Sequence, residues 1–340
     1  MTIGSGKPRA RELGLLFDGA PGPLNAITDV ASVEVGHLTL IEGSDIRTGV
    51  TAIHPRGRTA EAPAYAGYFS LNGNGEMTGT AWIEEAGLLS GPVVLTNTHS
   101  VGTARDAVIQ WLIRNGRLGP WHLPVVAETY DGALNEINGF HVKSEHVFQA
   151  LDTAVSGPVP EGNVGGGTGM ICYGYKGGIG TSSRIVDGNV VGVLVQANHG
   201  RRSQLRLRGK IQALPTETPE ANPDRGSIII VVATDAPMLP HQLRALAKRA
   251  SLGLGRTGAV ASLSSGDLFL AFSTGNPLAP TIDSDHQVIA LGQARCTPIY
   301  EAAVQATEEA IINALVAAET MTGKGGLTVE SLLGEHVPLP

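Results

Sequence analysis

A glycine–serine pair at positions 226–227 could carry chemistry. Gly226 ends a polar, proline-rich run, and Ser227 begins the apolar stretch Ile228–Val232 without a spacer. A serine hydroxyl can attack the carbonyl carbon of the preceding residue, which turns the peptide bond into an ester that water cleaves. Glycine before the serine favours this attack, because it adds no bulk and tolerates a strained backbone.

Cleavage at this bond would create a new N-terminal serine. Its hydroxyl would be a nucleophile, and its α-amine, with an ordinary pKa of about 7.7–8.0, would accept a proton near neutral pH. The residues also allow a simpler interpretation, in which Ser227 only joins a loop to a strand.

The segment 214–226, LPTETPEANPDRG, has three prolines and almost no large apolar side chain. We expect an exposed, mobile loop there that tolerates a chain break.

A second motif, GNVGGGTGM at 162–170, is rich in glycine. Its backbone N–H groups could cradle a phosphate, so a nucleotide-binding protein using the Gly162–Gly169 loop is one alternative. However, the motif lacks the Lys-Ser/Thr ending of a P-loop and does not match G-x-G-x-x-G after a strand. We favour a close approach of backbones near an active site.

Metal and cofactor chemistry find little support in the sequence. The histidines stand singly, and the segment LNGNGEMTG offers Glu76 without a complete ligand set. The two cysteines, Cys172 and Cys296, lack metal-ligand spacing, and we expect both to be buried as small apolar residues. The sequence therefore predicts neither a metal nor a cofactor.

Composition and charge limit the class of partner. The chain has 340 residues with a formal net charge of −7, which argues against a nucleic-acid partner. The basic stretch RRSQLRLRGK at 201–210 lacks interleaved aromatic residues and is interpreted as a solvated edge strand. The apolar runs are too short to span a bilayer, and the N-terminus lacks an apolar signal core. We expect a cytoplasmic protein without a membrane partner.

The elements that must position Ser227 can be outlined from hydrophobic patterns. Apolar runs predict strands at 31–40, 49–55, 91–97, 121–129, 169–175, 189–198, 228–232 and 266–274. Many are continuously apolar, which indicates strands covered on both faces. Helical periodicity predicts helices at 101–114, 142–154, 238–252 and 298–319. Strands packed between helices form a layered α/β or α+β sandwich, here as a single domain of 1–340.

Longer segments resemble a known family. GSIIIVVATDAPMLPHQLRALAKRASLGLGRTG, followed by SSGDLFLAFSTGN, resembles the small subunit of the self-processing DmpA-like aminopeptidases, which include L-aminopeptidase/D-esterases and β-peptidyl aminopeptidases. Upstream, the segments NAITDVASVEVGH, LNGNGEMTG, LTNTHSVGTARD, ETYDG, GNVGGGTGM and LVQANHGRR resemble the larger subunit. These matches run in family order from about residue 25 to residue 310.

The resemblance implies roles for individual residues. Ser227 would be the nucleophile, with cleavage after Gly226, and Ser265 and Asp267 in SSGD would be the supporting serine and acid. Ser265 would relay or position a proton beside Ser227, and an ionised Asp267 would orient Ser265. A branch of the β-peptidyl aminopeptidases has glutamate where Asp267 stands, which leaves the substrate class open.

Three further residues match family positions. Asn198, in VQANHG, matches the asparagine that stabilises the oxyanion. Tyr130 and Glu128 match the E-T-Y/W segment, in which Tyr130 is counted among the catalytic residues. A carboxylate in an apolar pocket suits recognition of a free substrate α-ammonium, so Glu128 is the expected substrate-binding residue.

The resemblance also implies a fold and an activity. The fold would be a four-layer αββα sandwich like that of the N-terminal-nucleophile hydrolases, but differently connected. The chain would be cut into a large subunit, 1–226, and a small subunit, 227–340, which assemble as a tetramer of heterodimers. The enzyme would release N-terminal residues from short peptides, amides and esters through an acyl-enzyme on Ser227. Alternatives are β-peptidyl specificity and an acyltransferase like the ornithine acetyltransferases, although those have threonine at the cleaved junction.

Overall fold

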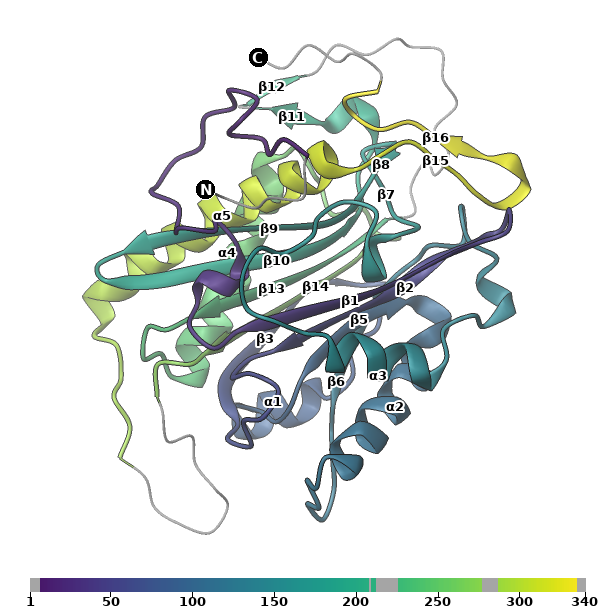
Figure 1. The fold of residues 1–340 in the computed structure, drawn as a ribbon. Helices are drawn as coiled ribbons and strands as arrows, with labels where there is room; N and C mark the ends of the chain where they lie inside the picture. The colour runs from purple at the N-terminus through teal and green to yellow at the C-terminus, as the bar shows by residue number, and fades with distance from the viewer. Residues whose placement is uncertain (1–6, 208, 212–225, 277–286, 335–340) are drawn as a thin grey trace.

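The computed structural model describes residues 7–207, 209–211, 226–276 and 287–334. Of the expected mobile loop at 214–226, only Gly226 belongs to this described part, and the other residues lie outside it. Two stacked β-sheets form the centre of the molecule (Figure 1).

The larger sheet holds Ser227. Its strand order is β4 (Leu88–Leu89), β3 (Ala64–Gly73), β14 (Gly266–Ser273), β13 (Ser227–Thr234), β10 (Asn189–Asn198) and β9 (Gly178–Val186). Strands β13 and β14 run parallel, and the other neighbours run antiparallel. The smaller sheet has the order β1 (Glu34–Glu42), β2 (Ile46–His54), β5 (Val93–Asn97) and β6 (Val125–Thr129), with β5 and β6 parallel.

Strand β13 shows why its sequence is continuously apolar. All eight of its residues are buried. Ile228, Ile230 and Val232 pack in the core beneath the helices, whereas Ile229, Val231 and Ala233 pack in the core between the two sheets. A strand covered on both faces has no side that favours polar residues, so the usual alternation is absent.

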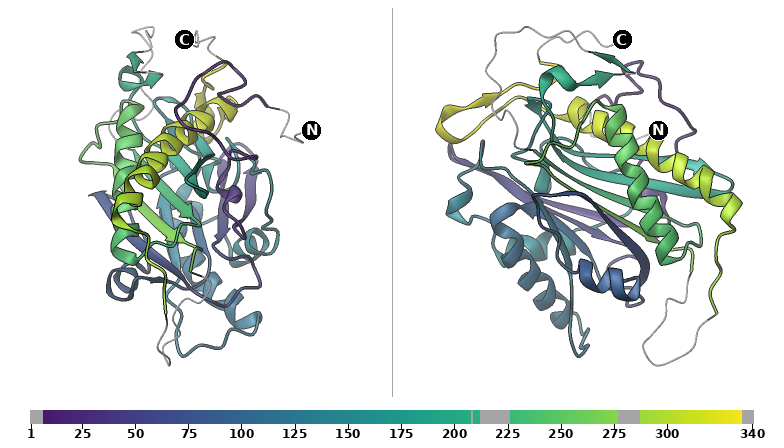
Figure 2. Two further views of the ribbon diagram at one scale, coloured as in Figure 1. Left: turned by 90° about the vertical axis from the view of Figure 1, so that its left-hand side faces the viewer. Right: turned by 180° about the vertical axis from the view of Figure 1, so that it is seen from behind.

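Helices cover the outer face of each sheet, as the two views of Figure 2 show. α4 (Pro240–Arg256) and α5 (Gln293–Ala317) pack on the larger sheet, and α2 (Val101–Arg114) and α3 (Ser144–Asp152) pack on the smaller one. The layers therefore follow the order αββα that the family resemblance implies. A short helix, α1 (Thr80–Ala86), follows β3.

Several predicted elements differ from the structure. Strands β3 and β9 are not among the predicted elements; β9 contains glycines, serines and the buried Arg184, a composition that is not typical of a strand. The predicted strand at 169–175 is instead a tight hairpin of β7 (Ile171–Cys172) and β8 (Tyr175–Lys176), because Tyr173 and Gly174 have positive φ angles of 51° and 68°. The last helix begins at Gln293, ahead of the predicted start, and includes Pro298.

The remaining elements are short. Part of the basic stretch forms a separate two-stranded hairpin of β11 (Arg206–Leu207) and β12 (Lys210–Ile211), in which each strand has one unpaired edge within the described residues. A further small hairpin pairs β15 (Met321–Thr322) with β16 (Thr328–Val329). Single 3-10 turns occur at Ile27–Asp29, Thr98–Ser100, Ile137–Gly139, Gly165–Gly167, Arg202–Gln204 and Lys324–Gly326.

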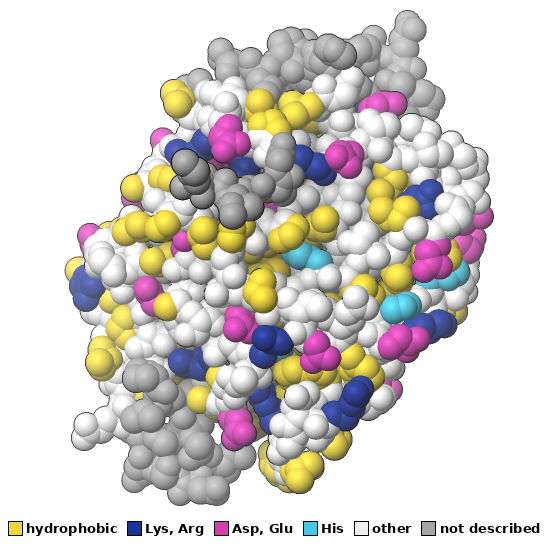
Figure 3. All heavy atoms as spheres, in the orientation of Figure 1, with side chains coloured by type: hydrophobic (Ala, Val, Ile, Leu, Met, Phe, Trp, Pro, Cys, Tyr) yellow, Lys and Arg dark blue, Asp and Glu magenta, His cyan; other side chains and the backbone are white. Residues whose placement is uncertain are grey.

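The surface carries charges of both signs. On the face drawn in Figure 3, acidic and basic side chains are interspersed and do not form one broad patch of a single sign. Among the described residues, each helix is too short or too polar to cross a bilayer. Cys172 and Cys296 are both buried and unpaired, as expected.

Candidate active site

Ser227 begins β13 in the middle of the larger sheet. Its Cα lies opposite Asn198 in the antiparallel ladder with β10 and opposite Gly266 in the parallel ladder with β14. The strand order thus brings together three segments that are far apart in the sequence. The side chain of Ser227 is buried, with 3% of the residue surface exposed.

The residue before Ser227 must be small. A Cβ atom on Gly226 would lie 2.9 Å from the His199 Cα and 3.1 Å from the Asn198 carbonyl oxygen. The Gly226 carbonyl oxygen accepts a hydrogen bond from the Gly266 N–H at 3.2 Å. Close packing on one side and a hydrogen bond on the other therefore hold the carbonyl that Ser227 would attack.

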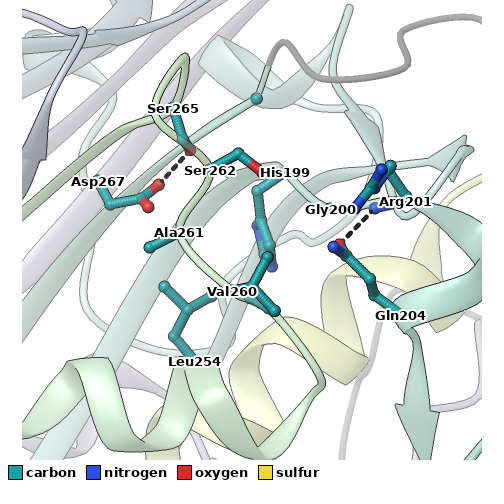
Figure 4. A pocket seen from close by; sticks show the side chains of 12 residues that line it. His199, Gly200, Arg201, Gln204, Leu254, Val260, Ala261, Ser262, Ser265 and Asp267 are labelled. Atoms are coloured by element: carbon teal, nitrogen blue, oxygen red, sulfur yellow. Dashed lines mark hydrogen bonds between the residues drawn. The ribbon is translucent and has the colours of Figure 1, made fainter.

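Ser265 and Asp267 form a hydrogen-bonded pair beside this junction. The Ser265 hydroxyl donates to Asp267 Oδ1 at 2.7 Å, as the dashed line in Figure 4 shows. Burial raises the pKa of the Asp267 carboxyl, while hydrogen bonds from Ser265 and from the Asn72 side chain oppose that shift. Because the Ser265 proton points to Asp267, the lone pairs of the Ser265 oxygen are left to accept a hydrogen bond, and Ser265 can take up a proton only if its own proton moves to Asp267.

Asn198 has a fixed amide orientation. Its Oδ1 accepts from the Ile171 N–H at 2.8 Å, and its Nδ2 donates to the Tyr130 carbonyl oxygen at 3.0 Å. Since the first contact requires an acceptor and the second a donor, the two ends of the amide are distinguished. Within the part of the chain that the structure describes, one Nδ2 hydrogen is left over, on a residue directly opposite Ser227 in the ladder. An N–H in this position could donate to an oxyanion formed beside Ser227.

Tyr130 contributes to the site through its backbone. Its carbonyl oxygen holds Asn198, whereas its side chain is among the exposed large apolar groups, with 37% of the residue surface accessible. A Cβ atom on Gly132 would lie 2.4 Å from the Tyr130 ring, so the ring folds back over its own loop. The family resemblance counts Tyr130 among the catalytic residues, but its residue type gives no signal for this backbone contact.

Glu128 lies at the same end of the two sheets. A Cβ atom on Gly75 would lie 3.3 Å from Glu128 Oε1 and 3.1 Å from the Cα of Gly266. A single glycine therefore separates the carboxylate from the strand that pairs with Ser227. Oε1 accepts from the Glu76 N–H at 3.0 Å, and Oε2 accepts from the Thr98 hydroxyl.

The Glu128 carboxyl is buried, and this burial raises its pKa. The hydrogen bonds from Thr98 and from the Glu76 backbone oppose that shift, so they favour the ionised form. An ionised carboxylate has about four lone-pair positions, of which these contacts use two. Among the contacts within the described residues, two lone-pair positions of the Glu128 carboxylate are therefore left to accept from a further donor, such as a cation.

Other residues of the site were not singled out in the sequence. The Asn72 Oδ1 accepts from the Asp267 N–H at 2.8 Å, and its Nδ2 donates to the Ser262 carbonyl at 2.9 Å, which fixes the loop that carries Ser265. His199 lines a small pocket beside Ser265 and Asp267 (Figure 4), and burial lowers the pKa of its imidazole to about 3. Asn72 lies in LNGNGEMTG, so the pairing of β3 with β14 was the missing signal.

The glycine-rich loop makes the close backbone approach that was expected. A Cβ atom on Gly166 would lie 2.1 Å from Gln196 Oε1, between the two sheets. The Gly165 and Gly166 N–H groups donate to the hydroxyls of Thr39 and Thr51 at 2.9 and 3.1 Å. Because these amides already have partners inside the protein, the loop gives the nucleotide-binding alternative no support.

Comparisons with known proteins agree with this architecture. The model of peptidase family S58 matches residues 25–329. The beta-peptidyl aminopeptidase BapA of Sphingosinicella microcystinivorans is 54% identical over 354 residues, which cover 96% of this chain and 89% of that protein. The solved L-aminopeptidase D-Ala-esterase/amidase of Ochrobactrum anthropi matches with a TM-score of 0.91 and 48% identity, over 97% of this chain and 96% of that one. A Burkholderia β-aminopeptidase matches with a TM-score of 0.89 and 47% identity, over the same shares of the two chains.

These matches confirm the predicted fold, because the Ochrobactrum structure is described as a new variant of the Ntn hydrolase fold. They also confirm the resemblance to the DmpA-like aminopeptidases. A peptidase family gives no support to the acyltransferase alternative. The family model and the relatives extend over nearly the whole chain, and the chain belongs to peptidase family S58.

Proposed function

We propose that this protein is a self-processing serine aminopeptidase that releases N-terminal residues from short peptides, amides and esters. The observation that carries the proposal is the position of Ser227. It begins β13 directly opposite Asn198, and the strand on its other side starts beside the Ser265–Asp267 pair. A nucleophile, a proton relay and an oxyanion donor therefore meet at one strand end.

Self-cleavage would begin on the Gly226–Ser227 bond. The Ser227 Oγ forms a bond to the Gly226 carbonyl carbon as its proton passes to the Ser265 Oγ, and the Ser265 proton moves at the same time to the Asp267 carboxylate. The carbon–nitrogen bond then breaks while the relay runs in reverse and delivers a proton to the leaving amine, so that residue 226 becomes an ester of Ser227. Water hydrolyses this ester to give the chains 1–226 and 227–340.

Turnover would use the same groups. After cleavage, the free α-amine of Ser227 can take the hydroxyl proton at near-neutral pH. The hydroxyl attacks the substrate carbonyl, and the free Nδ2 hydrogen of Asn198 stabilises the negative charge that develops on the carbonyl oxygen. The Ser227 α-ammonium returns the proton to the leaving amine, the carbon–nitrogen bond breaks, and water then hydrolyses the acyl ester on Ser227.

Selection for a free N-terminus would come from Glu128. Its carboxylate can pair with the substrate ammonium at a charge-assisted hydrogen bond, which contributes about 1.5–3 kcal/mol. β-Peptidyl specificity is the second candidate, favoured by the relative at 54% identity that is named a beta-peptidyl aminopeptidase. A β-amino acid places its amine one carbon farther from the attacked carbonyl than an α-amino acid does. The two specificities therefore require different distances between the Glu128 carboxylate and the Ser227 hydroxyl.

We also propose a cytoplasmic tetramer of processed heterodimers without a nucleic-acid or membrane partner. The interspersed surface charges of Figure 3 support the absence of a polyanion partner. Gel filtration with light scattering measures the assembly, and a monomeric mass would contradict this part of the proposal.

The central experiment compares wild type with Ser227→Ala. We expect wild type to give two bands on a denaturing gel, with Ser227 as the N-terminal residue of the smaller one by mass spectrometry. Ser227→Ala should give a single band and no hydrolysis of aminoacyl p-nitroanilides, since neither reaction has its nucleophile. A cleaved or active alanine variant would refute the proposal. A panel of L-, D- and β-aminoacyl amides then separates the two specificities.

A further inference from the structure

Lys176 is a completely buried cation held by main-chain carbonyls. Its Nζ donates to the carbonyl oxygens of Met170 at 2.8 Å, Gly177 at 2.9 Å and Gly167 at 3.3 Å. Within the described ranges, it forms no ion pair with a carboxylate. Burying an ammonium group is costly, and burial lowers the pKa of Lys176 to about 7. Its three donors are nevertheless all used, which favours the protonated form.

The Met170 contact leads directly to the proposed site. The Met170 carbonyl and the Ile171 N–H belong to one peptide unit. Lys176 holds the carbonyl of that unit, and the N–H donates to Asn198 Oδ1 at 2.8 Å. Because a peptide unit is planar, fixing the carbonyl direction also fixes the direction of the N–H.

The same connection transmits polarisation. A cation at the Met170 oxygen draws electron density from the peptide and makes the Ile171 N–H a stronger donor. A stronger donor at Asn198 Oδ1 in turn makes the Asn198 Nδ2 hydrogens more positive, as in a cooperative chain of hydrogen bonds. The chain ends at the amide that faces Ser227 across the ladder.

Backbone contacts anchor the lysine itself. The Lys176 N–H donates to the Glu330 carbonyl at 2.8 Å, and the Gly177 N–H donates to the Met170 carbonyl at 2.8 Å. The Met170 oxygen thus receives two hydrogen bonds, one of them from a cation. The hairpin β7–β8 returns the chain so that Lys176 lies beside the loop that precedes it.

We propose that Lys176 is a positioning residue for the oxyanion donor, acting on Asn198 through the Met170–Ile171 peptide. This inference rests on the proposed function, in which Asn198 stabilises the oxyanion. A merely structural lysine would support the glycine-rich loop and affect stability without a specific effect on turnover. The two roles predict different kinetics.

The test uses Lys176→Met, which keeps the length of the side chain and removes its charge and donors. Thr168→Val is the matched control, because the Thr168 hydroxyl donates to the Gly165 carbonyl at 2.6 Å in the same buried loop but does not touch the Met170 peptide. In processed enzyme, we expect Lys176→Met to lower kcat for an aminoacyl p-nitroanilide about 10- to 100-fold with KM within about threefold. The valine control should lower Tm with kcat within about threefold.

A double variant separates action through Asn198 from a general effect. If Lys176 acts through Asn198, Lys176→Met combined with Asn198→Ala should have the same kcat as Asn198→Ala by itself. If the losses in kcat of the two single variants multiply in the double variant, the inference is overturned. An unchanged kcat in Lys176→Met would also overturn it.

Lys176→Gln is the second variant for this test and replaces Lys176→Met if that variant does not fold. It keeps a neutral donor in the loop, so kcat should still fall, and a wild-type kcat would overturn the inference. Failure of the proposed function is distinguishable, because wild type would then be inactive or Ser227→Ala would be active, whatever residue stands at 176.

Discussion

Asn198 and Ser227 are directly opposite each other at the end of the β10–β13 ladder. The register of one pair of strands therefore sets the distance between the proposed oxyanion donor and the proposed nucleophile. A slip of one residue would turn each side chain of the strand to the other face. In β13, such a slip would move Ile228 and Ile229 into each other's cores, which are packed around different neighbours.

This relationship predicts the effect of Asn198→Ala. The variant loses the donor at the oxyanion, so kcat should fall about 10²–10³-fold, the usual cost of one such donor. Because self-cleavage passes through a similar oxyanion, the two-band pattern should also appear more slowly. Steady-state kinetics of the processed variant and a time course on denaturing gels measure the two effects. Loss of the folded state, seen by circular dichroism, would instead make Asn198 a structural residue.

Glu128→Gln tests recognition of the substrate amine. The glutamine keeps the shape but removes the charge, so the preference for a free-amine substrate over its N-acetyl form should shrink by about ten- to a hundredfold in kcat/KM. Self-cleavage should be intact, since that reaction involves no substrate ammonium. The exposed Glu76 is the matched control, and Glu76→Gln should leave the preference unchanged. An equal preference in wild type and Glu128→Gln would mean that another group binds the amine.

Glu128 should also affect how kcat/KM depends on pH. Since the pKa of Glu128 is raised by burial, its carboxylate loses its charge at a higher pH than an exposed glutamate. Binding of the ammonium is present above that pKa and is lost as the pH falls through it. The Ser227 α-amine gives an acidic limb of kcat/KM in both proteins, and Glu128 adds a second fall at lower pH in wild type, which should be absent from Glu128→Gln with the same substrate. An identical acidic limb in both proteins would assign it to another group.

Sequence and structure agree best where a pattern depends on local chemistry. The helix at 101–114 and the strand at 189–198 have their predicted bounds, because each has a clear apolar pattern. The site depends instead on which strands become neighbours. Asn72, the Tyr130 carbonyl and the Ile171 N–H enter the site through β3, β6 and the β7–β8 hairpin. Their residue types do not distinguish them from ordinary turn residues, so the sequence pattern could not predict their contacts.

Glu309→Gln tests what would hold the two proposed chains together after cleavage. Glu309, on the proposed small chain, accepts hydrogen bonds from Arg11 and Arg184, on the proposed large chain, at 2.8 and 2.7 Å. In this buried cluster the side chains of Glu309 and Arg184 are enclosed, and that of Arg11 is partly exposed. Burial would raise the pKa of Glu309, but these arginines lower it overall. Removing one member of a buried ion pair costs about 3–5 kcal/mol, so the processed variant should melt earlier and release its chains in mild urea.

The matched control is Glu308→Gln. Glu308 pairs with the partly exposed Arg256 at 3.0 Å within the small chain, and such surface pairs contribute about 1 kcal/mol or less. Because the pKa of Glu309 is lowered in the folded protein, its contribution to stability is fully present above the pKa of an unfolded glutamate. This contribution is lost as the pH falls through the lowered pKa. Gel filtration across urea and pH measures the association. Equal dissociation of the two variants would contradict a special role for the buried cluster.

Asp131→Asn tests a buried carboxyl whose pKa is raised, so its effect on the pH dependence of stability is opposite in sign to that of Glu309. Burial raises the pKa of Asp131 to about 7, although the side chains of Thr48, Asn135 and Asn97 oppose the shift. Between its unfolded pKa of about 3.9 and pH 7, the folded state holds a proton that the unfolded state has released. Wild type should therefore lose about 1.4 kcal/mol of stability per pH unit from this residue, roughly 2–4 °C in Tm, as the pH rises towards 7. Asparagine does not titrate. The Tm difference between Asp131→Asn and wild type should therefore change in favour of the variant by roughly 2–4 °C per pH unit between pH 5 and pH 7. The exposed Asp106 is the control, and Asp106→Asn should keep a constant Tm difference from wild type. A pH-independent difference for Asp131→Asn as well would mean that Asp131 is ionised in the folded protein throughout this range.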